Sequence, residues 1–519
     1  MAEPKRITSY VYNGDSGNYC APTTALVNGI PIGVLCSKTI TETTDANGSL
    51  AFGAAATVPA NVRTSTYTYN NLGQMLSSNA PRTDVTDVTT YAYFASNDAL
   101  GNYRIGDLNT VTNALGHVTT ISAYDAHGRP KTITDANGLV TQLTYTPRGW
   151  LNSRNVGGLL TQFTYDNVGQ LTKVTLPDAS FIGYAYDAAH RLTQITNAAG
   201  DKLVYTLDLM GNRTKEEVFT SANVVVQRKH RVFDNLSRLA TELNAANAVI
   251  AAYTYDNNGN VKTQTQKYDA VTTNDAITGF DYDPLNRLTK ITNALAGITQ
   301  YAYNGVDQLV SVTDPKSLIT SYTVDGLDNQ KQQISPDTGT TNSTYDAAGN
   351  LKTSTDARSK VSSYSYDALN RVTGVTFSDT TPTLGYLYDD ITLGNFGKGR
   401  LTKITDATGN TTYKYDIQGR LIQKTQTTGT VVKTIGYGYD TVGRMSSMTY
   451  PSGKVLSYAF DVQGRIASMA VNAVNLVSNI TYQPFGPAKS WTWSGGPVQT
   501  RAFDLDGRKR VIRIRRPAP

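Results

Sequence analysis

The chain has 519 residues, a mild excess of Lys and Arg over Asp and Glu that gives a formal net charge of +6, and only 17% charged residues. Charges of both signs are scattered, which argues against a nucleic-acid groove, and two cysteines cannot staple a chain of this length. Tyr, Val, Ile, Leu and Thr recur throughout, which excludes a disordered polymer and favours strands.

Residues 1–60 form an N-terminal segment with an atypical first repeat and a long loop. No apolar stretch of a signal peptide follows Met1, so we expect no Sec export. The longest apolar stretch, from Leu26 to Cys36, is too short and too interrupted to cross a bilayer, so we expect no transmembrane segment. Cys20 and Cys36 are interpreted as two buried thiols or as a local disulfide, and their spacing leaves both open.

One pattern returns through residues 61–507. It reads aromatic-x-aromatic-Asp-x-x-Gly-Arg/Asn-Leu-x-x-Ile/Val-Thr, followed by a second small turn, and FTYDNVGQLTKVT from Phe163 is a good copy. The turn acids Asp166, Asp187 and Asp208 lie 21 residues apart, and longer steps elsewhere are what loops inserted at turns would give. The register indicates a repeat array.

Each repeat contains two strand-like runs and two turns, without a helical period. Asp at the first turn position accepts bonds from the following backbone N–H groups, and Gly three residues later tolerates a positive φ, which predicts a hairpin with a type I turn and a G1 bulge. Arg or Asn after the Gly is expected to cap the turn or to pair with a neighbouring Asp. The Gly is replaced by His190, Ser237, Asn286, Asp307 and Asn370. The residues assigned to structural YD turns are Tyr165, Asp166, Gly169, Tyr186, Asp187, Tyr255, Asp256, Gly259, Tyr282, Asp283, Tyr345, Asp346, Gly349, Tyr366, Asp367, Tyr415, Asp416, Gly419, Tyr439, Asp440 and Gly443.

These repeats predict an all-β fold of repeated antiparallel β-hairpins, about 21 residues each, that form a curved or spiral hollow shell. The array provides on the order of 38 strands, far more than the roughly eight whose side chains fill a closed barrel. A propeller built from pairs of repeats is the minor alternative.

The repeats resemble the Rhs/YD-repeat family, which includes bacterial Rhs polymorphic toxins, the C component of insecticidal Tc toxins and the YD shell of teneurins. The resemblance covers about residues 5–507. It implies a cocoon that sequesters a toxic C-terminal domain, with secretion machinery such as type VI secretion as a further partner. The implied route is secretion or delivery to a neighbouring cell without Sec, after residence in the cytoplasm.

The chain departs from this family after its last repeat, RAFDLDGR from Arg501. Neither the family's self-cleaving core segment nor an effector follows, so payload release by autoproteolysis is not assigned to this chain. Residues 508–519 form a basic tail that is expected to be disordered rather than bound to nucleic acid or a membrane.

Catalytic and metal-binding motifs are weak in this sequence. Gly14-Asp15-Ser16-Gly17 matches the short signature around a protease nucleophile, but none of the four histidines has a protease-like context. Residues 45–48, 135–138 and 256–260 are similar to calcium loops, yet they lack the later bidentate acid. Glu216 and Glu217 are interpreted as solvated residues of an insertion. We therefore predict no enzyme activity, no catalytic residue, no metal and no cofactor.

Three hypotheses for function follow. The first is a structural shell of an Rhs-type toxin, without its effector and without specific nucleic-acid binding. The second is a surface adhesion or carbohydrate-binding module in which Trp491 and Trp493 contact sugars, although packing within the sheet is favoured for them. The third is a truncated product without an independent role. Free sheet edges also predict self-association.

Overall fold

The computed structural model describes residues 2–3, 5–45, 50, 54–58, 61–267 and 274–515. In these residues the regular structure is almost entirely β, with short 3-10 helices such as Asp15–Gly17 (η1) and Thr392–Gly394 (η4). Consecutive strands pair antiparallel along the chain, as β14 (Leu159–Tyr165) and β15 (Leu171–Thr175) do. The predicted all-β fold of repeated antiparallel hairpins is confirmed. No helix in the described part has the length and apolar character needed to cross a membrane.

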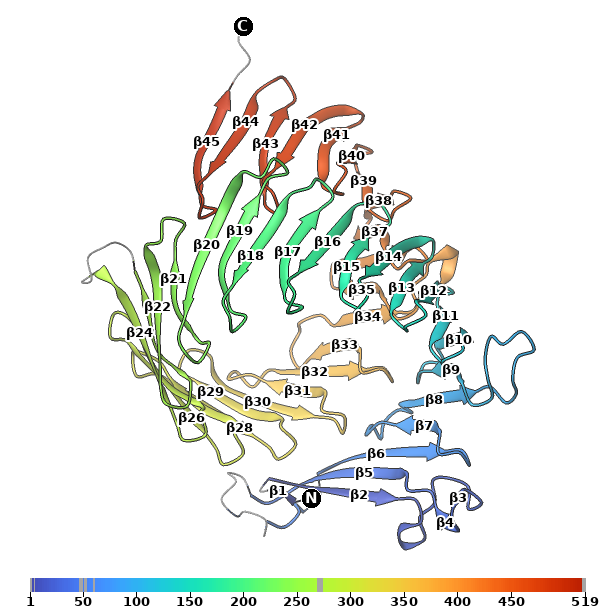
Figure 1. The fold of residues 1–519 in the computed structure, drawn as a ribbon. Helices are drawn as coiled ribbons and strands as arrows, with labels where there is room; N and C mark the ends of the chain where they lie inside the picture. The colour runs from blue at the N-terminus through green and yellow to red at the C-terminus, as the bar shows by residue number, and fades with distance from the viewer. Residues whose placement is uncertain are drawn as a thin grey trace. The chain divides into compact units, whose positions relative to one another are not determined.

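The chain divides into two compact units, each built from separate stretches of sequence. Unit 1 comprises residues 1–140, 297–419 and 426–432, and unit 2 comprises residues 141–296, 420–425 and 433–519. Each unit thus contains an early and a late ladder of strands. In unit 2, strands β16 to β20 run side by side in chain order (Figure 1).

The early ladder of unit 1 begins in the N-terminal segment, but β3 (Leu26–Val27) and β4 (Ile30–Pro31) form a small separate sheet. The strands of the ladder are β1 (Ala2–Glu3), β2 (Arg6–Tyr12), β5 (Leu35–Glu42), β6 (Val62–Tyr69), β7 (Met75–Asn79), β8 (Val88–Tyr93), β9 (Leu108–Thr112), β10 (Val118–Tyr124) and β11 (Pro130–Thr134). The late ladder consists of β26 (Ile298–Tyr303), β27 (Leu309–Thr313), β28 (Ile319–Val324), β29 (Gln330–Ser335), β30 (Gly339–Tyr345), β31 (Leu351–Thr355), β32 (Val361–Tyr366), β33 (Val372–Phe377), β34 (Leu384–Tyr388), β35 (Leu401–Asp406) and β36 (Gly409–Tyr415).

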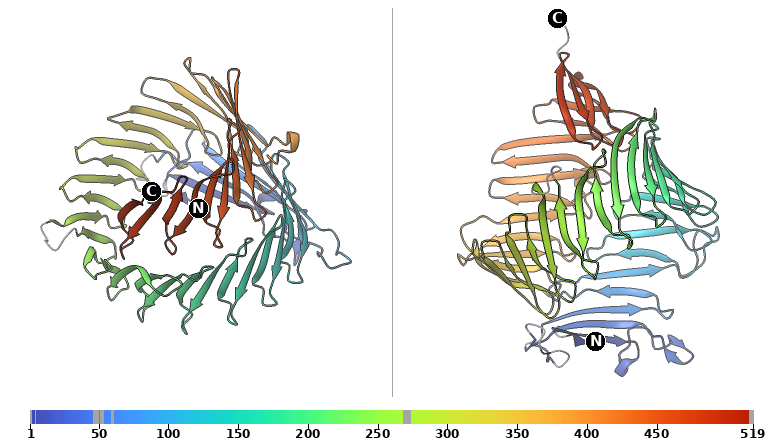
Figure 2. Two further views of the ribbon diagram at one scale, coloured as in Figure 1. Left: turned by 90° about the horizontal axis from the view of Figure 1, so that it is seen from above. Right: turned by 60° about the vertical axis from the view of Figure 1, so that its left-hand side comes forward.

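Unit 2 begins within β12 (Val140–Tyr145), and β37 (Leu421–Thr428) and the start of β38 (Val431–Tyr439) are divided between the units. Its early ladder continues through β13 (Leu151–Val156), β14, β15, β16 (Phe181–Tyr186), β17 (Leu192–Asn197), β18 (Lys202–Leu207), β19 (Arg213–Phe219), β20 (Val225–Phe233), β21 (Leu239–Leu243), β22 (Val249–Tyr255), β23 (Val261–Gln266), β24 (Ala276–Tyr282) and β25 (Leu288–Thr292). Its late ladder consists of β38 (Val431–Tyr439), β39 (Met445–Thr449), β40 (Val455–Phe460), β41 (Ile466–Val471), β42 (Val474–Tyr482), β43 (Ala488–Trp493), β44 (Val498–Phe503) and β45 (Lys509–Arg515). Neighbouring hairpins of one ladder lie parallel to one another in Figure 2.

The turns have the predicted chemistry. In the β14–β15 hairpin, Gly169 N donates to Asp166 O, Asp166 N donates to Gln170 O, and the register shifts between Thr164 and Tyr165, as a bulge requires. Gly169 has φ +97°. The residues that replace Gly in other repeats also have positive φ, and they are His190, Ser237, Asn286, Asp307 and Asn370.

Each ladder is a single layer of sheet with two unlike faces. Burial alternates along β14: Phe163 and Tyr165 are half-buried, whereas Gln162 and Thr164 are exposed. We call the side of Phe163 and Tyr165 the aromatic face, and the side of Thr164 the hydroxyl face. On the hydroxyl face, cross-strand hydroxyl pairs recur, such as Thr144 with Ser153 at 2.6 Å between the side-chain oxygens.

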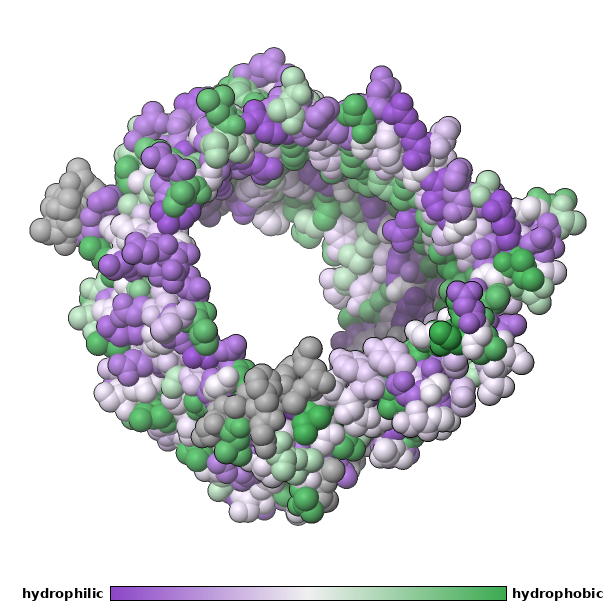
Figure 3. All heavy atoms as spheres, turned by 60° about the horizontal axis from the view of Figure 1, so that its bottom comes forward, coloured by the Kyte–Doolittle hydropathy of each residue, from purple (hydrophilic) through white to green (hydrophobic). Residues whose placement is uncertain are grey.

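A conventional core is missing from this architecture in the part of the chain that the structure describes. The strand-to-strand contacts join neighbours within a ladder, and no second sheet packs on either face. Few large apolar side chains are buried, Tyr124, Tyr205, Val218, Leu327, Val375 and Val477 being the main ones. Figure 3 shows hydrophobic and hydrophilic residues interspersed over the face that it displays.

The expectation of a disordered basic tail is wrong for residues 509–515. They form β45, which pairs antiparallel with β44 from Val498↔Arg515 to Phe503↔Lys509. Backbone bonds to β44 order this segment, and its charge does not prevent them. Residues 516–519 lie outside the described residues.

Candidate functional site

The turn aspartates organise each hairpin end. Asp187 Oδ1 accepts hydrogen bonds from the backbone N–H groups of Ala189 and Arg191, both at 2.9 Å, and Asp187 Oδ2 accepts one from Arg191 Nε at 2.8 Å. The Arg191 side chain and backbone N–H groups hold the pKa of this carboxyl below its usual range. The arginine after the turn position therefore pairs with its own turn acid.

The arginine at this position of the repeat also reaches the next hairpin, as Arg371 does. Arg371 pairs with Asp367 at 2.7 Å, and its guanidinium carbon lies 4.3 Å from the centre of the Tyr388 ring, in the strand that follows. The Tyr388 hydroxyl donates to Val372 O at 2.9 Å. Cation–π contact and hydrogen bond together tie one hairpin to its successor.

In many repeats, the tyrosine before the YD turn donates its hydroxyl to a backbone carbonyl of the preceding hairpin. Tyr165 Oη donates to Leu151 O, and Tyr186 Oη to Leu171 O, both at 2.9 Å. The same bond is made by Tyr93, Tyr255, Tyr345, Tyr366, Tyr388, Tyr415, Tyr439 and Tyr482. The repeat pattern does not predict this link, although the recurrent choice of Tyr over Phe at this position is a signal for it.

In unit 1, turns of the late ladder contact the early ladder through buried cations. Lys5 Nζ donates to Gln308 Oε1 at 2.8 Å and to Val324 O at 2.7 Å, and burial lowers the pKa of Lys5 although nearby carboxylates oppose this. Arg82 is buried, and its guanidinium donates to Asp367 O at 2.5 Å and to Asp84 at 2.6 Å. We call these contacts between ladders tier contacts.

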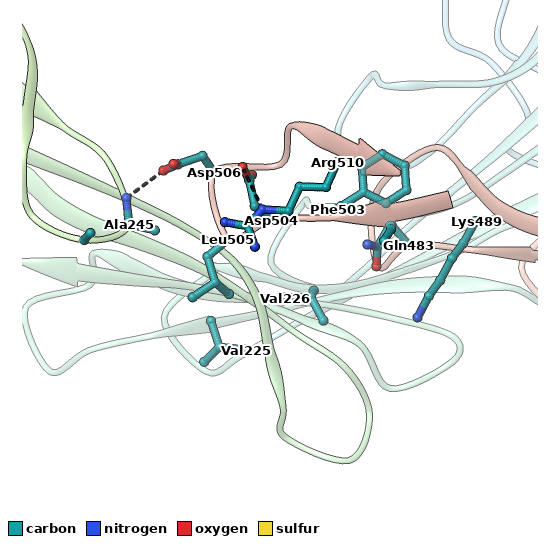
Figure 4. Close-up of a pocket in the computed structure, with 12 residues that line it drawn as sticks. Val225, Val226, Ala245, Gln483, Lys489, Phe503, Asp504, Leu505, Asp506 and Arg510 are labelled. Carbon is teal, nitrogen blue, oxygen red and sulfur yellow. Dashed lines mark hydrogen bonds and ion pairs between the residues drawn. The ribbon is translucent and has the colours of Figure 1, made fainter. Parts of the chain in front are cut away.

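Unit 2 has equivalent tier contacts. Arg444 Nη1 lies 3.1 Å from Asp178 Oδ2, and Arg228 N donates to Leu505 O at 2.7 Å. Asp506 accepts a hydrogen bond from Ala245 N at 2.6 Å, beside a cavity of about 620 Å³ (Figure 4). In both units, YD turns of the late ladder lie against the second turns of the early ladder.

Family comparisons agree with this geometry. The RHS Repeat model matches residues 282–319, 345–382, 397–431 and 436–473, and the Teneurin YD-shell model matches residues 102–215, so that together they match about half of the chain. The chain is an RHS/YD-repeat protein. No curated protein matches its sequence.

Solved structures share the fold of this RHS/YD-repeat chain. The crystal structure of TcdB2-TccC3-Cdc42 is 16% identical with a TM-score of 0.57, over 93% of this chain and 29% of that chain. The structure of TcdB2-TccC3 without the hypervariable C-terminal region is 15% identical with a TM-score of 0.58, over 99% of this chain and 30% of that chain. The RHS/YD-repeat chain thus spans less than a third of the length of these relatives.

The motifs that resembled catalytic or metal sites lie in ordinary turns. Ser16 lies in η1 with φ 49°. His190 is at a YD turn, with Nδ1 3.0 Å from Gln170 Oε1. Asp256 Oδ1 accepts the backbone N–H groups of Asn258 and Asn260, both at 2.9 Å, which uses the oxygen that a cation would need.

Metal-binding groups do not cluster elsewhere. Among the described residues, no group of three or more His, Cys, Asp or Glu side chains could hold a metal ion. Asp135 Oδ1 is likewise used by the N–H groups of Asn137 and Leu139. Of the similar run at 45–48, only Asp45 falls within the described residues.

Two interpretations need correction. Glu217 is not a solvated residue of an insertion: it is buried in β19, 2.8 Å from Lys215 Nζ and 2.7 Å from Arg228 Nε. Hairpin pairing places these cations beside it, which the repeat pattern alone does not indicate. Cys20 and Cys36 form a disulfide, so the alternative of two thiols is wrong.

Proposed function

We propose that this RHS/YD-repeat chain forms the wall of a container that sequesters a polypeptide cargo. The observation that carries the proposal is a single-layer sheet whose aromatic face has no second layer in the described residues. Rows of half-buried Tyr, Phe, Leu and Val side chains are unusual on a free surface. We therefore assign the aromatic face to the cargo side and the hydroxyl face to the solvent side.

A wall without a core needs another source of rigidity, and the contacts between neighbouring hairpins at their turns provide it. Hydroxyl bonds such as Tyr186 to Leu171 O, and cation–π contacts such as Arg371 over Tyr388, link each hairpin to its neighbour. Tier contacts then join the ladders within each unit. By its likeness to toxin shells, we propose that the cargo is a C-terminal toxin domain, that secretion machinery delivers the assembly by a route other than Sec, and that the chain is not an enzyme.

Adhesion through the tryptophans has less support. The Trp491 ring lies 6.3 Å from the Trp493 ring, and the Arg501 guanidinium lies 4.6 Å from Trp491. Trp491 is therefore engaged within the sheet, whereas Trp493 is 40% exposed. A platform for sugars would need a free ring face.

Protease protection tests the container directly. A disordered reporter polypeptide is fused after Pro519 of the full chain, and a second fusion carries the same reporter before Met1. At a proteinase K concentration that leaves the shell intact, we expect the C-terminal reporter to survive much longer than the N-terminal one. Equal digestion of both reporters would contradict the proposed sequestration.

A further inference from the structure

The sheet of unit 2 has two kinds of turn edge. We call the edge formed by the YD turns the YD edge, and the opposite edge, formed by the second turns, the return edge. In the early ladder, the return edge comprises turns such as 176–180, 220–224 and 244–248. In the late ladder, the YD edge comprises turns such as 440–444, 461–465 and 504–508.

The tier contacts join a YD edge to a return edge, except that Arg228 N, which donates to Leu505 O of a YD turn, lies within β20. In unit 2, the YD turn at 440–444 supplies Arg444 to Asp178 of a return turn, and the YD turn at 504–508 supplies Asp506 to the N–H of Ala245. Unit 1 follows the same rule, since the guanidinium of Arg82 from a return turn donates to Asp367 O of a YD turn. The two edges are therefore complementary surfaces.

Apolar side chains at the tips of YD turns distinguish occupied edges from free ones. In unit 1, Leu327 stands two residues after its turn Asp, lies in a tier contact beside Arg63, and is only 5% exposed. In the early ladder of unit 2, the matching residues are Val168 (62% exposed), Met210 (75%) and Leu236 (72%). Leu285, two residues after Asp283, and Leu209, next to Met210, are also largely exposed.

The late ladder of unit 2 leaves the complementary surface exposed. Its return turns at 450–454 and 471–474 carry Tyr450 and Val474, and both side chains are exposed. Unit 2 thus has two exposed edges, the YD edge of its early ladder and the return edge of its late ladder. Inside unit 2, an edge of each kind already binds the other: the YD edge of the late ladder contacts the return edge of the early ladder.

We propose that the YD edge of the early ladder in unit 2 docks the return edge of the late ladder in a second copy of this chain. The contact is head-to-tail: each copy gives a different edge, so that assembly does not end at a dimer unless the rotation closes a ring. Burial of Met210, Leu236 and Leu285 provides the apolar part, as burial of Leu327 does inside unit 1. This inference does not depend on the container role.

Sedimentation velocity of the full chain over a wide concentration range tests the contact. Leu236→Asp with Leu285→Asp blocks the YD edge, and Val474→Asp blocks the return edge, whereas Leu100→Asp, in an exposed loop of unit 1, is the matched control. We expect the wild type and the control to form species larger than a dimer. Each blocked variant alone should associate at least about tenfold more weakly.

Mixing the two blocked variants gives the decisive result. Each variant keeps the edge that the other lacks, so the mixture should form a 1:1 dimer that does not grow further. A wild-type chain that stays monomeric at all concentrations would overturn the proposal. So would blocked variants that assemble like the wild type, because association would then use another surface, such as the terminal strands.

Discussion

The hydroxyl of the tyrosine before a turn acid connects two hairpins, which a phenylalanine at that position cannot do. Tyr186 Oη donates to Leu171 O in the hairpin before it, and burial raises the pKa of Tyr186. The phenol thus stays protonated as a donor over the physiological range. Phe233 and Phe460 occupy this position in other repeats, where the link is lost but the ring remains.

We expect Tyr186→Phe to destabilise the sheet by about 0.5–1.5 kcal/mol, because a half-buried carbonyl loses its donor. Tyr184→Phe, on the same strand but without the bond to Leu171, is the control and should cost less. The measurement is the urea midpoint of each variant. Equal midpoints for Tyr186→Phe and the wild type would show that the hydroxyl link does not hold the hairpins.

The turn aspartates predict a loss of stability in acid. Burial tends to raise the pKa of Asp125, but hydrogen bonds from Arg129 and from the N–H of His127 outweigh it, and the pKa falls from 3.8 to about 2. A carboxyl with a lowered pKa stabilises the fold fully above its unfolded pKa and loses this effect as the pH falls through the folded value. Stability should therefore drop between pH 3.8 and about 2.

Urea unfolding across this range compares the wild type with Asp125→Asn. We expect the variant to be less stable than the wild type above pH 4 or so, and the difference to shrink as the acid protonates. Asp281→Asn, at an exposed strand position, is the control. A difference that stays constant down to about pH 2 would contradict the assigned role of the carboxylate.

Turn chemistry could be predicted from single residues because it is local. An Asp with a Gly three residues later predicts the bulged turn. His190 and Asn286 stand at the Gly position of their turns, and both therefore have a positive φ. The burial of Glu217 could not be predicted, because it depends on Arg228 from the next strand. A repeat pattern indicates which residues face the same side of a strand, but it does not indicate how far a side chain is covered.

At the scale of strands and hairpins, the ladder could be predicted but the tier contacts could not. Successive repeats pair because they are neighbours in sequence. Arg82 and Asp367 meet across 285 residues, and no short-range pattern marks either as a partner of the other. The strand β45 was not predicted either. Its basic residues indicated disorder, but its backbone is ordered by pairing with β44.

Arg82 provides the test of a tier contact. Its side chain is 2% exposed, so Arg82→Gln should destabilise unit 1 by about 2–4 kcal/mol, because buried acceptors lose their charged donor. Arg358→Gln is a matched control, since Arg358 also pairs with an Asp two residues away but is 82% exposed, and it should cost less than about 1 kcal/mol.

Amide hydrogen exchange locates the effect of these variants. We expect Arg82→Gln to speed exchange in the turn around Asp367, which lies far from Arg82 in sequence. Arg358→Gln should leave that turn unchanged. Faster exchange confined to the residues next to Arg82 would show that the tier contact is not made in solution.

For the whole molecule, stability is distributed along the ladder instead of being concentrated in a core. Each hairpin contacts its neighbours, as in other repeat proteins, so that local losses add up repeat by repeat. Such a sheet has no interior of its own, and its aromatic face must front something else. We propose that this face bounds a space closed to large molecules.

Adjacent residues on β14 distinguish the two faces. Thr161 lies on the aromatic face with Phe163 and Tyr165, and Gln162 lies on the hydroxyl face. Cys20 and Cys36 are joined, so Thr161→Cys or Gln162→Cys introduces the one reactive thiol. Leu100→Cys, in an exposed loop of unit 1, is the accessible control.

Labelling each variant with a small maleimide, and with a maleimide on a long polyethylene glycol chain, is the most direct measurement. We predict that the small reagent labels all three thiols, whereas the large reagent labels Gln162→Cys and Leu100→Cys but not Thr161→Cys. Reaction of the large reagent with Thr161→Cys as fast as with Gln162→Cys would contradict the enclosed space.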